Sequence, residues 1–268
     1  MELSVGNILR DHGWAVEHSP LYTDPESGKA REIDICATVH ADQVEEQRWV
    51  SVGLVIECKR TLDRPWVAFT APRDTTMLQV VNSIVADEFS RDLLYSVPPE
   101  VGLPPFLCPS NRIAHSVTRA FGAQKAGDPT GPYSALRGAM SAAIAIGAAS
   151  EELSIASSNE ILMADLLLPV VVIDGALFDF SITGTEEESL VEAPWIQTTI
   201  AGPTPGSVAI VTIITRSAFP DYLAALTPAA QGFALAMVAH VDKAREMTRR
   251  RRTRVSVLRA GGPDLFSR

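Results

Sequence analysis

The sequence has few cysteines, few aromatic residues and no long uninterrupted apolar run. Its three cysteines (Cys36, Cys58 and Cys108) form no C-x-x-C pair and no zinc-binding spacing with the five histidines. This argues against a secreted disulfide framework. The chain does not open with a basic segment followed by an apolar run, so no signal peptide is predicted. The most apolar stretch, residues 161–180, is interrupted by one proline and three aspartates, so we expect no membrane span and a cytoplasmic protein.

The charge balance and the absence of common catalytic motifs narrow the possible functions further. The 268 residues carry 23 Lys and Arg against 32 Asp and Glu, a net charge of −9 and a pI near 5.1. This is not typical of a protein that coats nucleic acid non-specifically, although a local basic surface suffices for an enzyme that acts on it. The sequence contains no G-x-S-x-G, Walker, G-x-G-x-x-G or H-E-x-x-H motif. A serine hydrolase, a nucleotide-driven motor and a zinc peptidase therefore have no support.

Hydrophobic periodicity and turn signals predict one α/β domain over residues 1–250. We expect a largely helical insertion at about residues 75–150 and a basic, flexible tail over residues 251–268. The predicted helices cover residues 3–12, 75–89, 111–122, 133–149, 219–226 and 228–249. The predicted strands cover residues 14–18, 31–40, 49–56, 170–174, 176–182, 189–199 and 207–215.

Ionisable residues lie on two apolar strands near the N-terminus. Asp34 stands in an alternating segment, and Glu57 and Lys59 follow an apolar, β-branched run. If the two strands form a hairpin centred between Glu45 and Glu46, Asp34 lies directly opposite Glu57, with their β-carbons about 5 Å apart. Lys59 is two residues further along, so it shares the same face of the sheet.

Two carboxylates this close repel each other unless a proton, a salt bridge or a divalent cation neutralises them. Oxygen ligands suit magnesium or manganese, and the backbone carbonyl of Cys58 would add a further ligand. Lys59 would orient or deprotonate an attacking water, or stabilise negative charge that develops on a phosphate. The alternative is an ion-pair cluster on an ordinary hairpin.

The segments 31–35 (REIDI) and 55–59 (VIECK) resemble the motif of the PD-(D/E)XK nuclease superfamily, the restriction-endonuclease-like proteins. The resemblance covers about the first seventy residues, and Ile33 stands where the motif has proline. It implies an αβββ core with a mixed central sheet and C-terminal helices. It also implies that Asp34 and Glu57 bind Mg²⁺, for which Mn²⁺ can substitute, and that Lys59 assists the water. Many members carry another carboxylate on the first helix. Glu2 is the candidate here, and Glu17, on the strand after Gly13, is the second choice.

The resemblance implies a magnesium-dependent endonuclease acting on DNA, of the restriction, defence or repair type. The alternative is a catalytically inactive subunit of the same fold that binds or scaffolds a nucleic-acid-processing or defence complex. RNA is a third possible substrate. A homodimer or a partner protein fits either hypothesis. The basic run 249–254 would contact phosphates or form a solvated tail.

Overall fold

In the computed structural model of the chain, the described residues are 1–43, 48–61, 63–72, 85–86, 88–96, 112–120, 131–156, 162–182, 187–202 and 208–261. The helices are α1 (Glu2–Asp11), α3 (Glu88–Tyr95), α4 (Pro132–Ala156), α5 (Phe219–Val238) and α6 (Val241–Gly261). The strands are β1 (Ala15–His18), β2 (Leu21–Thr23), β3 (Ala30–Glu32), β4 (Ile35–Gln43), β5 (Arg48–Arg60), β6 (Trp66–Pro72), β7 (Val85–Ala86), β8 (Arg112–Arg119), β9 (Leu162–Asp174), β10 (Leu177–Ile182), β11 (Glu188–Glu192), β12 (Trp195–Ala201) and β13 (Val208–Thr215).

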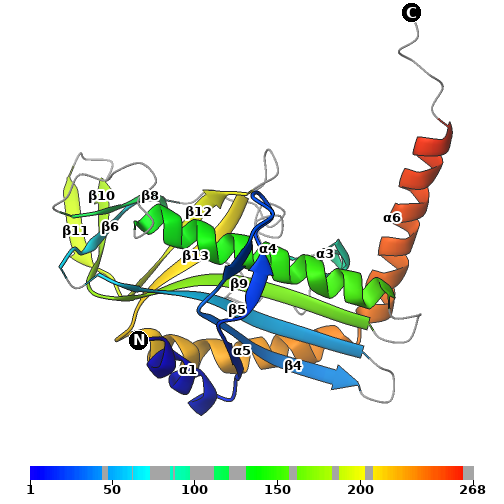
Figure 1. The fold of residues 1–268 in the computed structure, drawn as a ribbon, viewed down its shortest axis with the longest axis horizontal. Helices are drawn as coiled ribbons and strands as arrows, with labels where there is room; N and C mark the ends of the chain where they lie inside the picture. The colour runs from blue at the N-terminus through cyan, green and yellow to red at the C-terminus, as the bar shows by residue number, and fades with distance from the viewer. Residues whose placement is uncertain are drawn as a thin grey trace, which may run out of the picture.

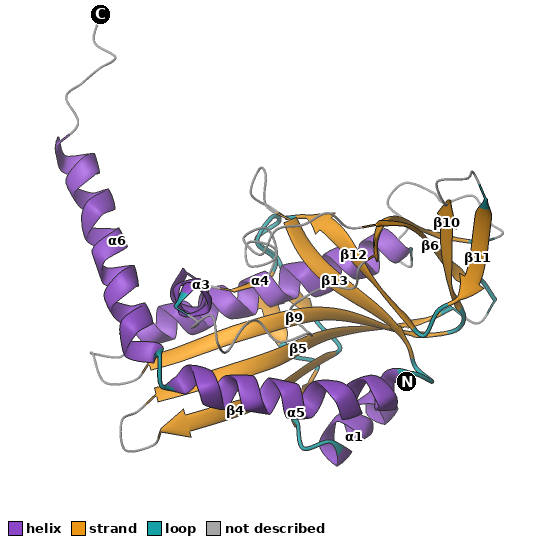
Figure 2. Cartoon of the chain, turned by 180° about the vertical axis from the view of Figure 1, so that it is seen from behind, coloured by secondary structure: helices purple, strands orange, loops and turns teal. Residues whose placement is uncertain are grey.

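One eleven-stranded mixed sheet runs through these residues in the order β1-β4-β5-β9-β13-β12-β8-β6-β10-β11, with β7 also paired to β9. β1, β4 and β5 are antiparallel neighbours, whereas β9 is parallel to both β5 and β13. Helix α4 crosses one face of the sheet (Figure 1), and α1 and α5 cover the opposite face, seen from behind in Figure 2. The protein is therefore an α/β protein with helices on both faces of a mixed sheet.

The central strands β5 and β9 are buried because neighbouring strands flank them and helices cover both faces. Each is thirteen residues long and carries a nearly continuous apolar run, the pattern expected of strands with no solvent face. Ile56 and its neighbours on one face join a core cluster with α1 and α5. Val55 and its neighbours on the other face join a second cluster with α4. The alternation that separates these clusters also decides which face each polar side chain of β5 occupies.

Most of the predicted elements are confirmed. The predicted helices over 3–12 and 133–149 correspond to α1 and α4, and the strands over 14–18, 49–56, 176–182 and 207–215 correspond to β1, β5, β10 and β13. The segment 31–40 is interrupted at residues 33–34, between β3 and β4. The segment 189–199 is split at Ala193 and Pro194 into β11 and β12. The strand predicted over 170–174 is the end of β9.

The helix predicted over 111–122 is wrong, because residues 112–119 form β8, an internal strand of the sheet. Ile113, Ala114 and Val117 fit a helical stripe and a strand face equally well, and pairing with β6 and β12 decides between them. The insertion is therefore not wholly helical. Most of the helix predicted over 75–89 lies outside the described residues, but Val85 and Ala86 form a strand.

The C-terminal helices also differ from the prediction. α5 continues through Pro228, because residues on both sides of the proline, including Leu226, Ala230 and Phe233, are buried in the core and offset the lost helix hydrogen bond. α6 extends to Gly261, so residues 251–261 are helical rather than a flexible tail, and the rest of the predicted tail, residues 262–268, lies outside the described residues. Arg, Leu and Ala favour helix, and no glycine or proline interrupts α6 before its last residue.

Among the described helices, none alone is long and apolar enough to cross a membrane. α5 and the described start of α6 pass that test only as a pair, and they are bent by 66° relative to each other.

Candidate active site

The register of the β4–β5 hairpin brings the predicted residues together. Ile35 lies opposite Ile56 and Cys36 opposite Val55, and this pairing continues to Gln43 opposite Arg48. The predicted hairpin centre is therefore confirmed. Asp34 immediately precedes β4. Continuing the register by one residue beyond the pair Ile35 and Ile56 brings Asp34 opposite Glu57.

Asp34 is held by hydrogen bonds from two neighbouring segments. Its carboxylate Oδ2 accepts a hydrogen bond from the backbone N–H of Cys58 at 2.6 Å. Its carbonyl accepts one from the backbone N–H of Ser19 at 3.0 Å, and Ser19 adopts a positive φ of 54° at the turn after β1. The side chain is half-buried, and burial raises the pKa of Asp34 although the Cys58 N–H opposes the shift. The charges of Glu2 and Glu32 raise it further.

Glu57 lies on the α4 side of β5, with a side chain only 16% exposed. A β-carbon on Gly138 of α4 would lie 3.8 Å from its Oε2, so the helix backbone passes directly over this carboxylate. Lys59 Nζ donates a hydrogen bond to Glu57 Oε1. Burial raises the pKa of Glu57 more than Lys59 lowers it, and the charges of Asp34 and Glu2 add to the rise.

Glu2 occupies the first turn of α1, where a negative charge is favourable. It is exposed, yet its charge contributes to the raised pKa values of Asp34, Glu57 and Cys58. α1 therefore places a third carboxylate, that of Glu2, where it interacts electrostatically with Asp34 and Glu57.

Cys58 contributes its backbone, not its thiol. Strand alternation turns its side chain to the opposite face from Glu57, where it packs against the core cluster that contains α5. Burial raises the pKa of the Cys58 thiol, so it stays protonated and is a poor metal ligand. The predicted ligand at this position was the backbone carbonyl, which stays a prediction.

The residues fit a magnesium ion by their chemistry. No group of three or more His, Cys, Asp or Glu side chains arranged to hold a metal occurs within the described part of the chain. Mg²⁺, however, usually takes one or two carboxylates and keeps several waters. Asp34 and Glu57 supply two oxygen ligands, and burial raises the pKa of both carboxyl groups.

Two features of this region were not predicted from the sequence. Tyr22, on the short β2–β3 hairpin, is buried, and burial raises its pKa, with smaller contributions that include the charge of Glu57. Gly138 is the second feature, and it allows the backbone of α4 to approach Glu57 closely. Both come from segments with no chemical motif of their own.

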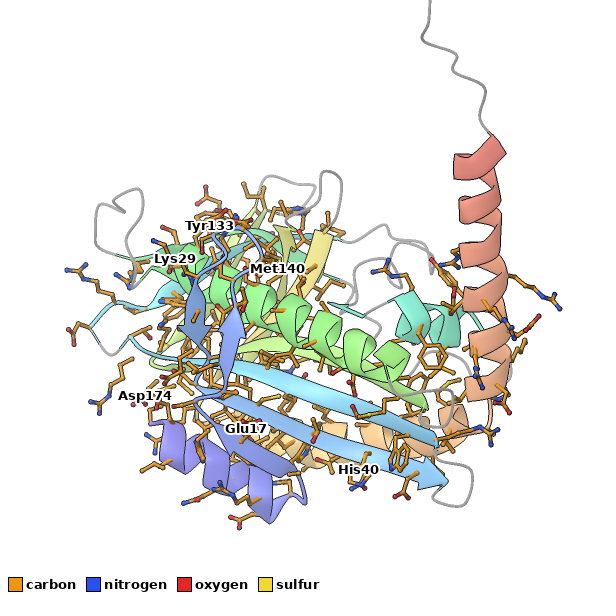
Figure 3. The ribbon with its side chains drawn as sticks, turned by 45° about the vertical axis from the view of Figure 1, so that its right-hand side comes forward. Glu17, Lys29, His40, Tyr133, Met140 and Asp174 are labelled. Carbon is orange, nitrogen blue, oxygen red and sulfur yellow. The ribbon has the colours of Figure 1, made fainter. Side chains whose placement is uncertain are left out.

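A second charged cluster lies where β5, β9 and β13 end, beside α1 (Asp174 is labelled in Figure 3). Asp174 Oδ2 lies 3.8 Å from Arg60 Nε and 3.6 Å from Arg216 Nη1. Arg216 Nη2 also donates to Ser4 Oγ of α1 at 3.2 Å. Alternation along β5 puts Arg60 on the opposite face from Glu57 and Lys59. This cluster fixes α1 against the ends of the strands.

No family model matches this sequence, and no curated protein or solved structure shows significant similarity to it. The residues of the site itself are therefore the only basis for inferring the function.

Proposed function

We propose that the protein is a magnesium-dependent nuclease of the PD-(D/E)XK type, a cytoplasmic enzyme that hydrolyses phosphodiester bonds in DNA. The observation that carries the proposal is the gathering of Asp34, Glu57 and Lys59 at the end of one hairpin. The order of α1 followed by the antiparallel strands β1, β4 and β5 agrees with the αβββ core of that superfamily. The free thiols of Cys36 and Cys58 are compatible with a reducing compartment.

Each residue of the cluster has a distinct role in this proposal. Asp34 and Glu57 would hold the ion, and the Cys58 N–H fixes the orientation of the Asp34 carboxylate. When bound, magnesium supplies a Lewis acid that activates water and offsets charge on the phosphate. Lys59, held against Glu57, places an ammonium group where it can orient the attacking water or stabilise charge on the phosphate oxygens.

The proposal is tested by Mn²⁺ titration and by DNA cleavage assays with Mg²⁺ or Mn²⁺. We expect Glu57→Gln to weaken Mn²⁺ binding and to lower the cleavage rate by at least about 100-fold, since a metal supplies several kcal/mol of transition-state stabilisation. Glu192→Gln is the matched control, because Glu192 is an exposed carboxylate on β11, at the other edge of the sheet. If the wild-type protein binds no Mn²⁺ and cuts neither DNA nor RNA, the proposal is wrong.

A second candidate is a catalytically inactive subunit that binds or scaffolds a nucleic-acid-processing complex. It is favoured by the contact of Lys59 with Glu57, which already neutralises one carboxylate without a metal. Under this alternative the Mn²⁺ titration shows no Glu57-dependent binding, and Lys59→Ala affects stability alone.

A further inference from the structure

Positive charge is concentrated in the last helix. α6 contains eight of the 23 Lys and Arg residues of the chain and two of its 32 Asp and Glu residues. The helix thus carries a net charge of +6, and the remaining residues carry −15. The overall net charge of −9 does not reveal this separation of positive from negative charge.

The first half of α6 is anchored to the body of the protein. Val241, Ala244 and Thr248 are buried along one side. Asp92 of α3, with no exposed surface, accepts hydrogen bonds from Thr248 Oγ1 at 2.8 Å and from Arg251 Nη2. A buried carboxylate with two partners fixes the direction in which the helix leaves the sheet.

The first turn of α6 has a further anchor on the central sheet. Arg48, the first residue of β5, donates to both carboxylate oxygens of Asp242, at 2.6 and 3.2 Å. This contact ties the start of α6 to the strand that carries Glu57 and Lys59 at its other end.

Beyond Arg251 the helix leaves the body and projects away from the sheet (Figures 1 and 2). Its last ten residues span about 15 Å at 1.5 Å per residue. They include Arg252, Arg254 and Arg259 and no acidic residue. A basic rod projecting from an acidic body concentrates polyanions at the rod and repels them from most of the remaining surface.

We propose that α6 is an arm that binds the phosphate backbone of nucleic acid and holds it near the protein, independently of catalysis. The choice of nucleic acid over an acidic protein rests on the proposed function, since a phosphodiester substrate is itself a polyanion. Arginine suits this role because its planar guanidinium binds phosphate with two parallel hydrogen bonds. Contacts to phosphates confer affinity and a strong dependence on salt, without sequence preference.

The test is binding of a duplex of about 30 bp by the full-length protein in EDTA, followed by fluorescence anisotropy from about 50 to about 200 mM salt. The variant is Arg252→Gln combined with Arg254→Gln, because glutamine keeps helix propensity and removes charge. One control replaces both arginines by lysine. A second control, Arg10→Gln with Arg64→Gln, changes the net charge equally at exposed positions outside α6.

We expect the glutamine variant to bind the duplex more weakly and to show a log–log salt slope shallower by about 1.8, about 0.9 for each lost phosphate contact. The control in which both arginines are replaced by lysine should keep most of the wild-type salt slope. The inference is overturned by unchanged binding, by an equal loss in the Arg10/Arg64 control, or by tight binding of polyglutamate with none of DNA. EDTA removes any metal, so a failure of the nuclease proposal leaves this result unaffected.

Discussion

At the scale of single residues, the pair Asp34 and Glu57 lowers the stability of the fold at neutral pH. Burial raises both pKa values, and the charge of Glu2 adds to each rise, so the folded protein binds protons at these sites more readily than the unfolded chain. The penalty is present in full above the raised pKa values and is relieved as the pH falls through them. Such a penalty is typical of groups retained for function rather than for stability.

Asp34→Asn should therefore stabilise the protein at neutral pH. Asparagine keeps an oxygen that can accept from the Cys58 N–H and removes the charge, so we expect the melting temperature at pH 7.5 to rise by roughly 1–3 °C, a small effect because the group is only half-buried. The difference should shrink as the pH falls through the raised pKa of Asp34, where the wild-type residue takes up its proton. Asp11→Asn, an exposed change on α1, is the control, and a lower melting temperature of Asp34→Asn at neutral pH would contradict this account.

At the scale of elements, the local sequence pattern predicted the β4–β5 hairpin. The features that the sequence did not reveal depend on contacts between segments that are distant in sequence. The short connection between β4 and β5 and their alternation fix a register that the sequence reveals, and with it the meeting of Asp34 and Glu57. β8 was mistaken for a helix because its partners, β6 and β12, are distant in sequence. The approach of α4 to Glu57 was likewise invisible, since a glycine within a helix shows no partner in the sequence.

The packing of α4 over Glu57 can be tested at Gly138. Gly138→Ala adds a methyl group at an ordinary contact distance of 3.8 Å from Glu57 Oε2, so Mn²⁺ affinity should stay within about twofold. Gly138→Leu forces a larger side chain into the carboxylate, and Mn²⁺ affinity should fall at least about tenfold. Calorimetric titration measures both values. Equal affinities in the two variants would show that α4 does not confine the site.

The attachment of α6 to α3 depends on one buried carboxylate. Asp92→Ala removes the acceptor of Thr248 and Arg251, so we expect the free energy of unfolding to fall by about 1–3 kcal/mol and trypsin to cleave α6 faster. Denaturant unfolding and limited proteolysis measure the two effects. Asp63→Ala, an exposed change, should alter neither, and an unchanged cleavage rate of Asp92→Ala would rule out this anchor.

At the scale of the whole molecule, the site and the basic arm lie toward opposite ends of one strand. Arg48, paired with the first turn of α6, and Lys59 are eleven residues apart on β5, which corresponds to about 36 Å at about 3.3 Å per residue. The arm begins beyond Arg48, so a nucleic acid that contacts both regions must span at least this distance, about 11 bp at about 3.4 Å per base pair.

If the protein is the proposed nuclease, substrate length should therefore modulate the effect of α6 on cleavage. For a duplex of about 30 bp, Arg252→Gln with Arg254→Gln should lower kcat/KM in proportion to the loss of binding. For a duplex of about 8 bp, roughly 27 Å long, the same variant should match the wild type, because the duplex cannot reach both regions. Steady-state cleavage assays compare the two lengths, and an equal loss on both would contradict the spatial separation.

The pleat of β5 makes the protein more sensitive to changes in chain length than to substitutions. Successive side chains of this strand alternate between the cluster under α4 and the cluster under α5. Deleting one codon between Arg48 and Glu57 would turn Glu57 and Lys59 toward the face covered by α5 and would bring Cys58 and Arg60 to the face covered by α4. Homologous sequences that keep Asp34, Glu57 and Lys59 should therefore align across this strand without a gap.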